Sequence, residues 1–241
     1  MGTITKQDLE SVIKDTFSEL YKISIEKSNS RLIFPKYRTE KTRISEQELR
    51  FLFIEKLKPI LEKNDCYYSI ETPTEDIYKF SEGKKPQKPK RLPKDTNTEE
   101  TMGYQSAAFD LVIHCNNIDK NEERVAIIEF KTKGNMHEYA KDICKLGNKN
   151  EGGESTLRYF IIVVNKIAYS KKEKKDTKQS LKERFSFENK QIDFEEFKED
   201  AEINVICYSL EEGKGNGNGK FVDIVPDKPD NTKLNLHSIT F

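Results

Sequence analysis

Two acidic residues and one lysine have the types and the spacing to act on a phosphate ester. The apolar segment 124–131 is typical of a strand and carries Glu129 and Lys131. Alternate residues of a strand share one face, so these two side chains are expected to be roughly 6–7 Å apart along it. A second apolar strand is expected at 107–115 and carries Asp110. The chemistry of this set depends on whether the two strands bring the acids together.

The polar loop at 116–123 determines which residues of the two strands are opposed. If the hairpin folds symmetrically about Asp119 and Lys120, Asp110 lies opposite Glu129, with side chains about 5 Å apart. Two like charges this close disfavour each other unless a cation lies between them. Mg²⁺ takes hard oxygen ligands and keeps waters for a substrate phosphate. The pair therefore predicts a Mg²⁺ (or Mn²⁺) site, in which Lys131 would hold a water and offset phosphate charge.

The alternation of each strand also predicts what lies on its faces. Phe109, Leu111 and Ile113 should share one face of the first strand, with Asp110 on the other. Phe130 should point towards a core, away from its acidic and basic neighbours. A lone Glu-x-Lys is common by chance at strand ends, where it is structural. The upstream acid, the apolar hairpin and the helix that follows favour a functional interpretation here.

The elements that would position these residues alternate between helix and strand. An amphipathic helix is expected at 6–22, and a second begins near Ser45 and breaks or restarts at Pro59. Other expected elements are a strand at 66–70, a helix at 136–146, a buried strand at 157–164, a basic helix at 174–185, a strand at 201–210, and short strands at 221–224 and 234–241. This order predicts one α/β domain over 1–241, with its core at about 43–210 and a mixed central sheet between helices.

The hairpin and the helix before it resemble the PD-(D/E)xK nuclease superfamily. The resembling segments are 109–113, 127–131 and the helix start at 45–49, and the resemblance covers about 43–164. Asp110 matches the family's first acid, while Glu129 and Lys131 match its Glu-x-Lys. Phe109 stands where the family name has proline. The resemblance implies a restriction-endonuclease-like α/β/α sandwich.

The activity that this resemblance implies is metal-dependent hydrolysis of phosphodiester bonds. The enzyme would be an endonuclease acting on DNA, in a setting such as restriction or phage defence, and Asp110 and Glu129 would hold Mg²⁺. Many such enzymes are homodimers, but the sequence carries no interface signature. The alternative is a non-catalytic nucleic-acid-binding or assembly subunit that keeps the fold.

The helices could add polar groups to this site. In the family, a Glu from the first core helix often takes part, and Glu46 and Glu48 are the candidates. Glu46 lies at the edge of the apolar face, whereas Glu48 stands three residues after Ser45, which is a capping-box spacing. We therefore favour Glu46. Four further polar residues follow the second strand of the hairpin, and we expect them on a solvated helix face: Lys133, His137, Asp142 and Lys145.

The net charge hides two basic segments. Lys and Arg number 42, as do Asp and Glu. This balance excludes a uniformly basic protein that coats nucleic acid. An irregular insertion is expected at 80–103, and within it 83–94 has six positive charges and no negative one. The segment 166–185 is also basic. These segments are candidates for contact with a phosphate backbone, or they only solubilise the surface: Lys84, Lys85, Lys88, Lys90, Arg91, Lys171, Lys172, Lys174 and Lys175.

Other features exclude several classes of protein. No apolar run approaches the ~18 residues of a membrane span, and the first 20 residues lack the apolar region of a secretory signal. The four cysteines form no Cys-x-x-Cys pair, so a zinc site is not expected. Reduced thiols and a cytoplasmic location are the expectation that follows.

Overall fold

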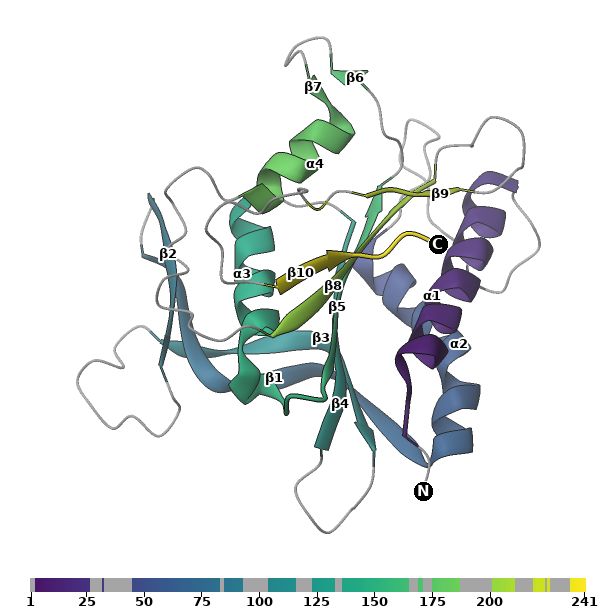
Figure 1. Cartoon of the computed structure of the whole chain (residues 1–241), viewed down its shortest axis with the longest axis horizontal. Coiled ribbons are helices and arrows are strands. Elements are labelled where there is room, and N and C mark those ends of the chain that lie inside the picture. Colours follow the sequence, from purple (N-terminus) through teal and green to yellow (C-terminus); the bar gives the residue numbers. More distant parts are fainter. Residues whose placement is uncertain are drawn as a thin grey trace.

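The fold is described here from a computed structural model (Figure 1). It describes residues 3–26, 32, 45–82, 85–92, 104–115, 123–132, 136–164, 169–170, 175–186, 201–210, 219–223, 225 and 235–241. Within these ranges the chain alternates helices and strands, as expected for an α/β protein.

A mixed, open sheet forms the middle of the molecule. Seven strands lie in the order β10-β8-β5-β4-β3-β1-β2, and β9 pairs with β8. Strands β1, β3 and β4 are antiparallel neighbours, whereas β4, β5, β8 and β10 run parallel. The bounds are β1 Cys66–Glu82, β2 Lys85–Leu92, β3 Gln105–Cys115, β4 Glu123–Lys131, β5 Leu157–Val164, β8 Glu202–Ser209, β9 Lys220–Phe221 and β10 Asn235–Ser238. A separate pair joins β6 Tyr169–Ser170 to β7 Lys175–Asp176.

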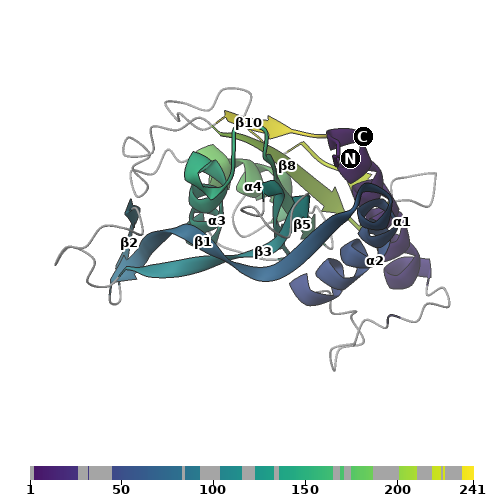
Figure 2. The same ribbon diagram turned by 90° about the horizontal axis from the view of Figure 1, so that it is seen from below.

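Helices flank the sheet on both faces. In Figures 1 and 2, α1 and α2 lie on one side of the sheet and α3 and α4 on the other. Their bounds are α1 Lys6–Tyr21, α2 Glu46–Asn64, α3 Met136–Gly147 and α4 Thr177–Ser186, with short helices η1 Lys22–Glu26 and η3 Lys149–Glu151. The expected α/β architecture with a mixed sheet between helices is confirmed.

Each face of the sheet has its own apolar core. One core joins α1 and α2 to β3, β4, β5 and β8, and the other joins α3 and α4 to alternate residues of the same strands. Strand β5 is buried on both faces, which is why its sequence is a continuous apolar run. Phe130 of β4 packs on the first core, with its ring centroid 5.3 Å from that of Phe53. Its expected direction, away from Glu129 and Lys131, is confirmed.

Helix α2 continues through Pro59, where the sequence predicted a break. Proline removes one backbone hydrogen bond and crowds the preceding turn. The apolar stripe of α2 nevertheless extends past this position, because Leu57 and Leu61 are both buried in the first core. Burial of that stripe outweighs the local cost of the proline. The helix ends at Asn64 and is followed by Asp65, which has a left-handed φ of 52°.

The region after residue 70 is more regular than expected. Strand β1 runs on to Glu82, and β2 spans Lys85–Leu92 within the stretch that the sequence predicted to be an irregular insertion at 80–103. Strand β2 stands last in the sheet order. An edge strand uses only one side of its backbone for pairing, so Pro86 and Pro89 are tolerated there.

A buried carboxylate stabilises an irregularity in β1. The pairing of β1 with β3 shifts register between Pro73 and Ile77, which takes backbone groups out of the ladder. Glu151, which is fully buried, accepts hydrogen bonds from the backbone N–H groups of Glu75 and Asp76 at 2.8 and 3.1 Å. The hydroxyl of Tyr78 also donates to it, at 2.7 Å. The short helix η3 is thereby tied to β1.

Two cysteines that were expected as reduced thiols are joined. Cys66 and Cys115 form a disulfide between β1 and β3, where they are directly paired with Cα atoms 4.3 Å apart. Their separation of 49 residues gives no sign of this pairing, which depends on the strand register. Cys144 and Cys207 are buried and take no part in a disulfide.

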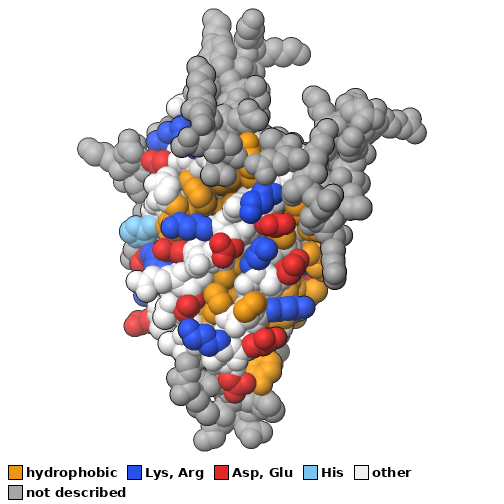
Figure 3. Space-filling model, turned by 90° about the vertical axis from the view of Figure 1, so that its right-hand side faces the viewer, with side chains coloured by type: hydrophobic (Ala, Val, Ile, Leu, Met, Phe, Trp, Pro, Cys, Tyr) orange, Lys and Arg blue, Asp and Glu red, His pale blue; other side chains and the backbone are white. Residues whose placement is uncertain are grey.

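The surface over α1 and α2 mixes both signs of charge. Figure 3 views this side, and on its described part Lys and Arg side chains alternate with Asp and Glu, without a patch of either sign. None of the described helices is long and apolar enough to cross a membrane.

Replacing Pro59 by Ala should stabilise the protein. Alanine restores the backbone donor within α2, and Pro59 is exposed, so no packing is lost. We expect the free energy of unfolding to rise by about 1–2 kcal/mol, after allowing for the greater freedom of the unfolded chain. Thermal unfolding followed by circular dichroism checks this. Lys58→Ala, at the exposed neighbouring position, is the control and should change stability little; an unchanged or lower melting temperature for Pro59→Ala contradicts the prediction.

Reduction of the disulfide should destabilise the fold. Opening a loop of this size is expected to lower the free energy of unfolding by about 2–4 kcal/mol. The measurement is thermal unfolding with and without dithiothreitol. The Cys66→Ala/Cys115→Ala double variant should unfold at the temperature of the reduced wild type and be insensitive to dithiothreitol. A wild-type melting temperature that does not respond to the reductant is the contrary outcome.

Candidate functional site

The β3–β4 hairpin has the register that the sequence predicts as far as Leu111 and Ile128, the residues next to Asp110 and Glu129. Leu111 pairs with Ile128, and the next two pairs follow in step, which is the symmetric register expected from the loop. The register shifts by one residue only at His114, away from the acids. The charged residues therefore gather near the carboxyl end of β4.

Glu129 and Lys131 both face α3, as the alternation of β4 predicts. The Lys145 ammonium lies 2.5 Å from Glu129 Oε1, and Lys131 Nζ lies 3.0 Å from Asp142 Oδ2. Asp142 Oδ1 is also 3.2 Å from Lys145, so this carboxylate joins the two lysines. Asp142 and Lys145 are buried, which corrects the expectation that they lie on a solvated helix face.

Lys131 is held as a cation. Burial alone would lower the pKa of its ammonium, but the neighbouring carboxylates outweigh burial and raise that pKa. Asp142 is the main cause, followed by Glu46 and Glu129. Lys131 is therefore able to donate hydrogen bonds and offset negative charge, and it is not able to act as a base at neutral pH.

Asp110 is held from the opposite side of the sheet. Its Oδ1 accepts a hydrogen bond from Arg50 of α2 at 2.6 Å, and its Oδ2 accepts one from the backbone N–H of Phe130 at 2.8 Å. The expectation that Phe109 shares a face with Leu111 is wrong, because Phe109 packs in the core beneath α3 and Leu111 in the core beneath α1 and α2. The alternation of β3 is broken at Asp110, which allows its carboxylate to reach α2.

Glu71 of β1 adjoins this break. Its neighbours Ile70 and Thr72 pair with Leu111 and Phe109, so Glu71 lies beside Asp110. Its φ of 50° is left-handed, a conformation that costs about 1–3 kcal/mol for a residue other than glycine. Arg50 Nη1 donates to the Glu71 carboxylate at 2.6 Å, which helps to hold the strained backbone.

The two candidate helix carboxylates have different surroundings. Glu48 accepts a hydrogen bond from the backbone N–H of Ser45 at 3.2 Å, as expected of a capping residue. Glu46 lies instead near the end of β4, where the N–H of Thr132 is 3.4 Å from its Oε1. Of the two, Glu46 is the one whose charge interacts with that of Lys131.

We refer to Glu46, Arg50, Glu71, Asp110, Glu129, Lys131, Asp142 and Lys145 as the charged cluster. It holds five carboxylates and three cations, an excess of two negative charges when all are ionised. Burial raises the pKa of Glu129 well above its usual range, and the charges of Asp142 and Asp110 add to this. Burial also raises the pKa of Glu46. These are surroundings in which a divalent cation would be stabilising.

The donors of the charged cluster fit a Mg²⁺ ion in type and charge. Asp110 and Glu129 supply carboxylate oxygens, each with lone pairs beyond those that its present partners use. In the described part of the chain, no group of three or more His, Cys, Asp or Glu is arranged to hold a metal ion. A Mg²⁺ site here would thus use two carboxylates and take its other ligands from water and substrate phosphate, as such sites often do.

Sequence reasoning missed Arg50 and dismissed Asp142 and Lys145, although the sequence carries a sign of each. Asp142 stands three residues after Tyr139 and four before Leu146, both buried, so it lies within the apolar stripe of α3. Lys145 follows it by one turn. Arg50 stands four residues after Glu46, on the same side of α2. A charged residue at a buried helical position is itself a sign of a partner.

The nucleic-acid candidates lie mostly beyond what the structure describes. The side chains of Lys85, Lys88, Lys90 and Arg91 are not described, although their backbone forms β2. The same holds for Lys175 in β7. Four candidates fall outside the described residues: Lys84, Lys171, Lys172 and Lys174.

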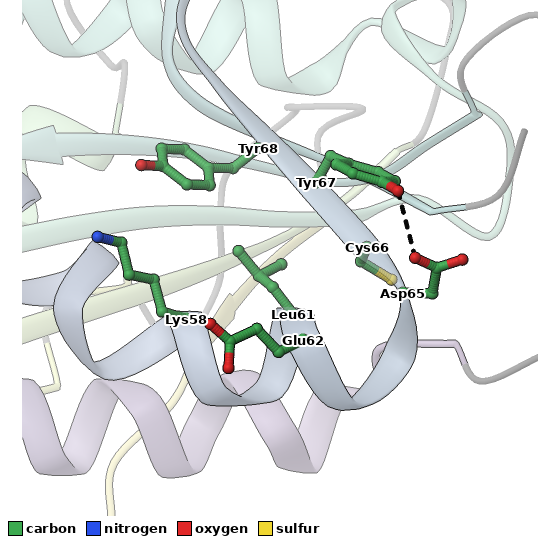
Figure 4. Close-up of a pocket in the computed structure, with 7 residues that line it drawn as sticks. All are labelled: Lys58, Leu61, Glu62, Asp65, Cys66, Tyr67 and Tyr68. Atoms are coloured by element: carbon green, nitrogen blue, oxygen red, sulfur yellow. Dashed lines mark hydrogen bonds between the residues drawn. The ribbon is translucent and has the colours of Figure 1, made fainter. Parts of the chain in front are cut away.

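A pocket of about 500 Å³ lies apart from the charged cluster, where α2 ends and β1 begins (Figure 4). Its lining mixes apolar, basic and acidic side chains, and Tyr67 donates a hydrogen bond to Asp65 at 3.2 Å. No member of the charged cluster lines it.

Comparison with known proteins adds no assignment. No protein-family model matches this chain, and no curated protein matches it.

Replacing Asp142 by Asn should destabilise the fold. The change removes the negative charge that lies 3.0 Å from Lys131 and 3.2 Å from Lys145. We expect the free energy of unfolding to fall by about 2 kcal/mol, because both lysine side chains are largely buried. Urea unfolding measures this. Glu138→Gln, one turn earlier at an exposed position of α3, is the matched control. Equal stability of the two variants contradicts the prediction.

Proposed function

We propose that this chain is a metal-dependent nuclease that hydrolyses phosphodiester bonds in DNA. The observation that carries the proposal is the convergence of Glu46, Asp110, Glu129 and Lys131 at the end of β4. These are the residues that the resemblance to the PD-(D/E)xK superfamily picks out. They come from α2, β3 and β4, so their meeting depends on the tertiary fold and not on local spacing.

The order of elements supports a restriction-endonuclease-like fold. Helix α2 is followed by the antiparallel strands β1, β3 and β4, then by α3 and the parallel strand β5. Asp110 stands on β3 and Glu129 on β4, the second and third of these strands. Helix α3 covers the face to which Glu129 and Lys131 point. The resemblance places its site on the same hairpin.

Each residue has a role that its surroundings permit. Asp110 and Glu129 would hold the metal ion, which supplies a more acidic water and stabilises charge on the phosphate. Lys131, held as a cation, would orient the attacking water and offset the charge that develops on the phosphate oxygens. Glu46 would orient Lys131 and accept hydrogen bonds at the rim of the site. Hydrolysis adds the water oxygen to phosphorus and breaks one P–O ester bond, giving a phosphomonoester and a hydroxyl.

One observation favours the alternative, a non-catalytic subunit that binds nucleic acid. Both candidate metal-binding carboxylates already have a cationic partner, Arg50 for Asp110 and Lys145 for Glu129. Such pairing can be purely structural. The alternative predicts DNA binding without cleavage, so a cleavage assay separates the two functions.

Cleavage should require the divalent metal and the charged cluster. Supercoiled plasmid, linear DNA and single-stranded RNA are incubated with Mg²⁺ or Mn²⁺, or with EDTA. We expect DNA to be cleaved only when metal is present. The cleavage rate should fall by about 100-fold or more in Glu129→Gln and in Lys131→Met. Gel analysis of the products measures the rates.

The matched control for Glu129→Gln is Glu123→Gln, an exposed position at the start of β4. It should cleave at the wild-type rate. Thermal unfolding of each variant confirms that it is folded. Cleavage that persists in both Glu129→Gln and Lys131→Met would refute the site, and DNA binding with no cleavage by the wild type would favour the non-catalytic alternative.

A further inference from the structure

Lys145 makes the densest set of polar contacts in the charged cluster. Its ammonium contacts Glu129 Oε1, lies 3.2 Å from Asp142 Oδ1 and donates to the backbone carbonyl of Ala108 at 2.7 Å. It also lies 5.4 Å from the centre of the Phe109 ring. Only 4% of the Lys145 side chain is exposed, so an unpaired charge there would be very unfavourable.

Lys145 and a metal ion would need the same carboxylate. Only 3% of the Glu129 side chain is exposed, so its oxygens are reached from within the cluster. Lys145 lies against one of them. A divalent cation at Glu129 would come close to the Lys145 ammonium, and like charges at contact distance in a buried site repel strongly. The Lys145 ammonium and a metal ion would therefore compete for the Glu129 carboxylate.

Lys145 can give up that contact without losing all its partners. Asp142 and the Ala108 carbonyl remain as acceptors when Glu129 turns to a metal ion. Lys131 does not compete for Glu129 in this way, since its ion pair is with Asp142. Arg50 pairs with Asp110 and Glu71 on the opposite side of the sheet. Lys145 is thus the cation of the cluster that a metal ion at Glu129 would most directly replace.

We propose that Lys145 is the resident counter-ion of Glu129 and competes with the divalent metal for this carboxylate, so that Lys145 determines how tightly the site binds metal. The inference rests on the proposed function, because it requires that Glu129 binds metal. Lys145 is a positioning residue in this scheme: it holds the Glu129 carboxylate in the metal-free protein and is displaced from it as the metal enters.

The test is Mn²⁺ binding by isothermal titration calorimetry with the full chain. Lys145→Gln removes the competing charge and keeps a side chain that donates hydrogen bonds. We expect it to bind Mn²⁺ at least about tenfold tighter than the wild type. It should also melt at a lower temperature in EDTA and gain more from added Mn²⁺, since a ligand stabilises the state that it binds. Lys141→Gln, one turn earlier at an exposed position, makes the same charge change outside the cluster and should bind as the wild type does.

Lys145→Arg keeps the cation and tests the inference even if Lys145→Gln does not fold. It should bind Mn²⁺ no more tightly than the wild type, and a tenfold gain in this variant overturns the competition. If the wild type and Lys145→Gln bind Mn²⁺ equally tightly, and Glu129→Gln shows that Glu129 is needed for this binding, the role of Lys145 is overturned but the metal site is not. Absence of Mn²⁺ binding in both overturns the metal site itself, and with it the proposed function.

Discussion

The buried charges of the charged cluster are paired with one another, and the organisation of the candidate site follows from that constraint. Glu129 lies inside the protein because Lys145 is there to pair with it, and Asp142 is inside because it pairs with two lysines. An unpaired ion in such surroundings would cost several kcal/mol. Helix α3 must therefore pack with Asp142 and Lys145 against β4, and α2 must present Arg50 to Asp110. Charge pairing and apolar packing select the same placement of the helices.

Most of the fold could be predicted from periodicity. The amphipathic helices, the buried strand β5 and the hairpin register are confirmed, because each follows from a pattern within one or two neighbouring segments. Pro59 and strand β2 were mispredicted for a shared reason. Proline weakens a helix or a strand locally, but a buried stripe in one case and an edge position in the other made the proline tolerable. Neither circumstance is visible before the tertiary structure is known.

The site was predicted in outline and missed in its partners. Asp110, Glu129 and Lys131 could be proposed as one group because they share a hairpin whose register the loop length determines. Arg50 and Lys145 come from helices on opposite faces of the sheet, and no local pattern says which carboxylate each will meet. The break in alternation at Asp110 is equally non-local, since it is tied to the left-handed backbone of Glu71 on the next strand. Long-range pairing of charges is therefore the part of the structure that cannot be predicted from a single sequence.

The disulfide has a consequence for alignment of the site as well as for the stability of the fold. Cys66 and Cys115 are opposed five residues before Glu71 and five residues after Asp110, on the same pair of strands. Sliding β1 by one residue along β3 would turn its side chains to the opposite face and carry Glu71 away from Asp110 and Arg50. A covalent link between directly opposed residues forbids any such slip. The disulfide thus fixes the register of β1 on β3, and it keeps an irregular stretch of these two strands in the one alignment that brings their charges together.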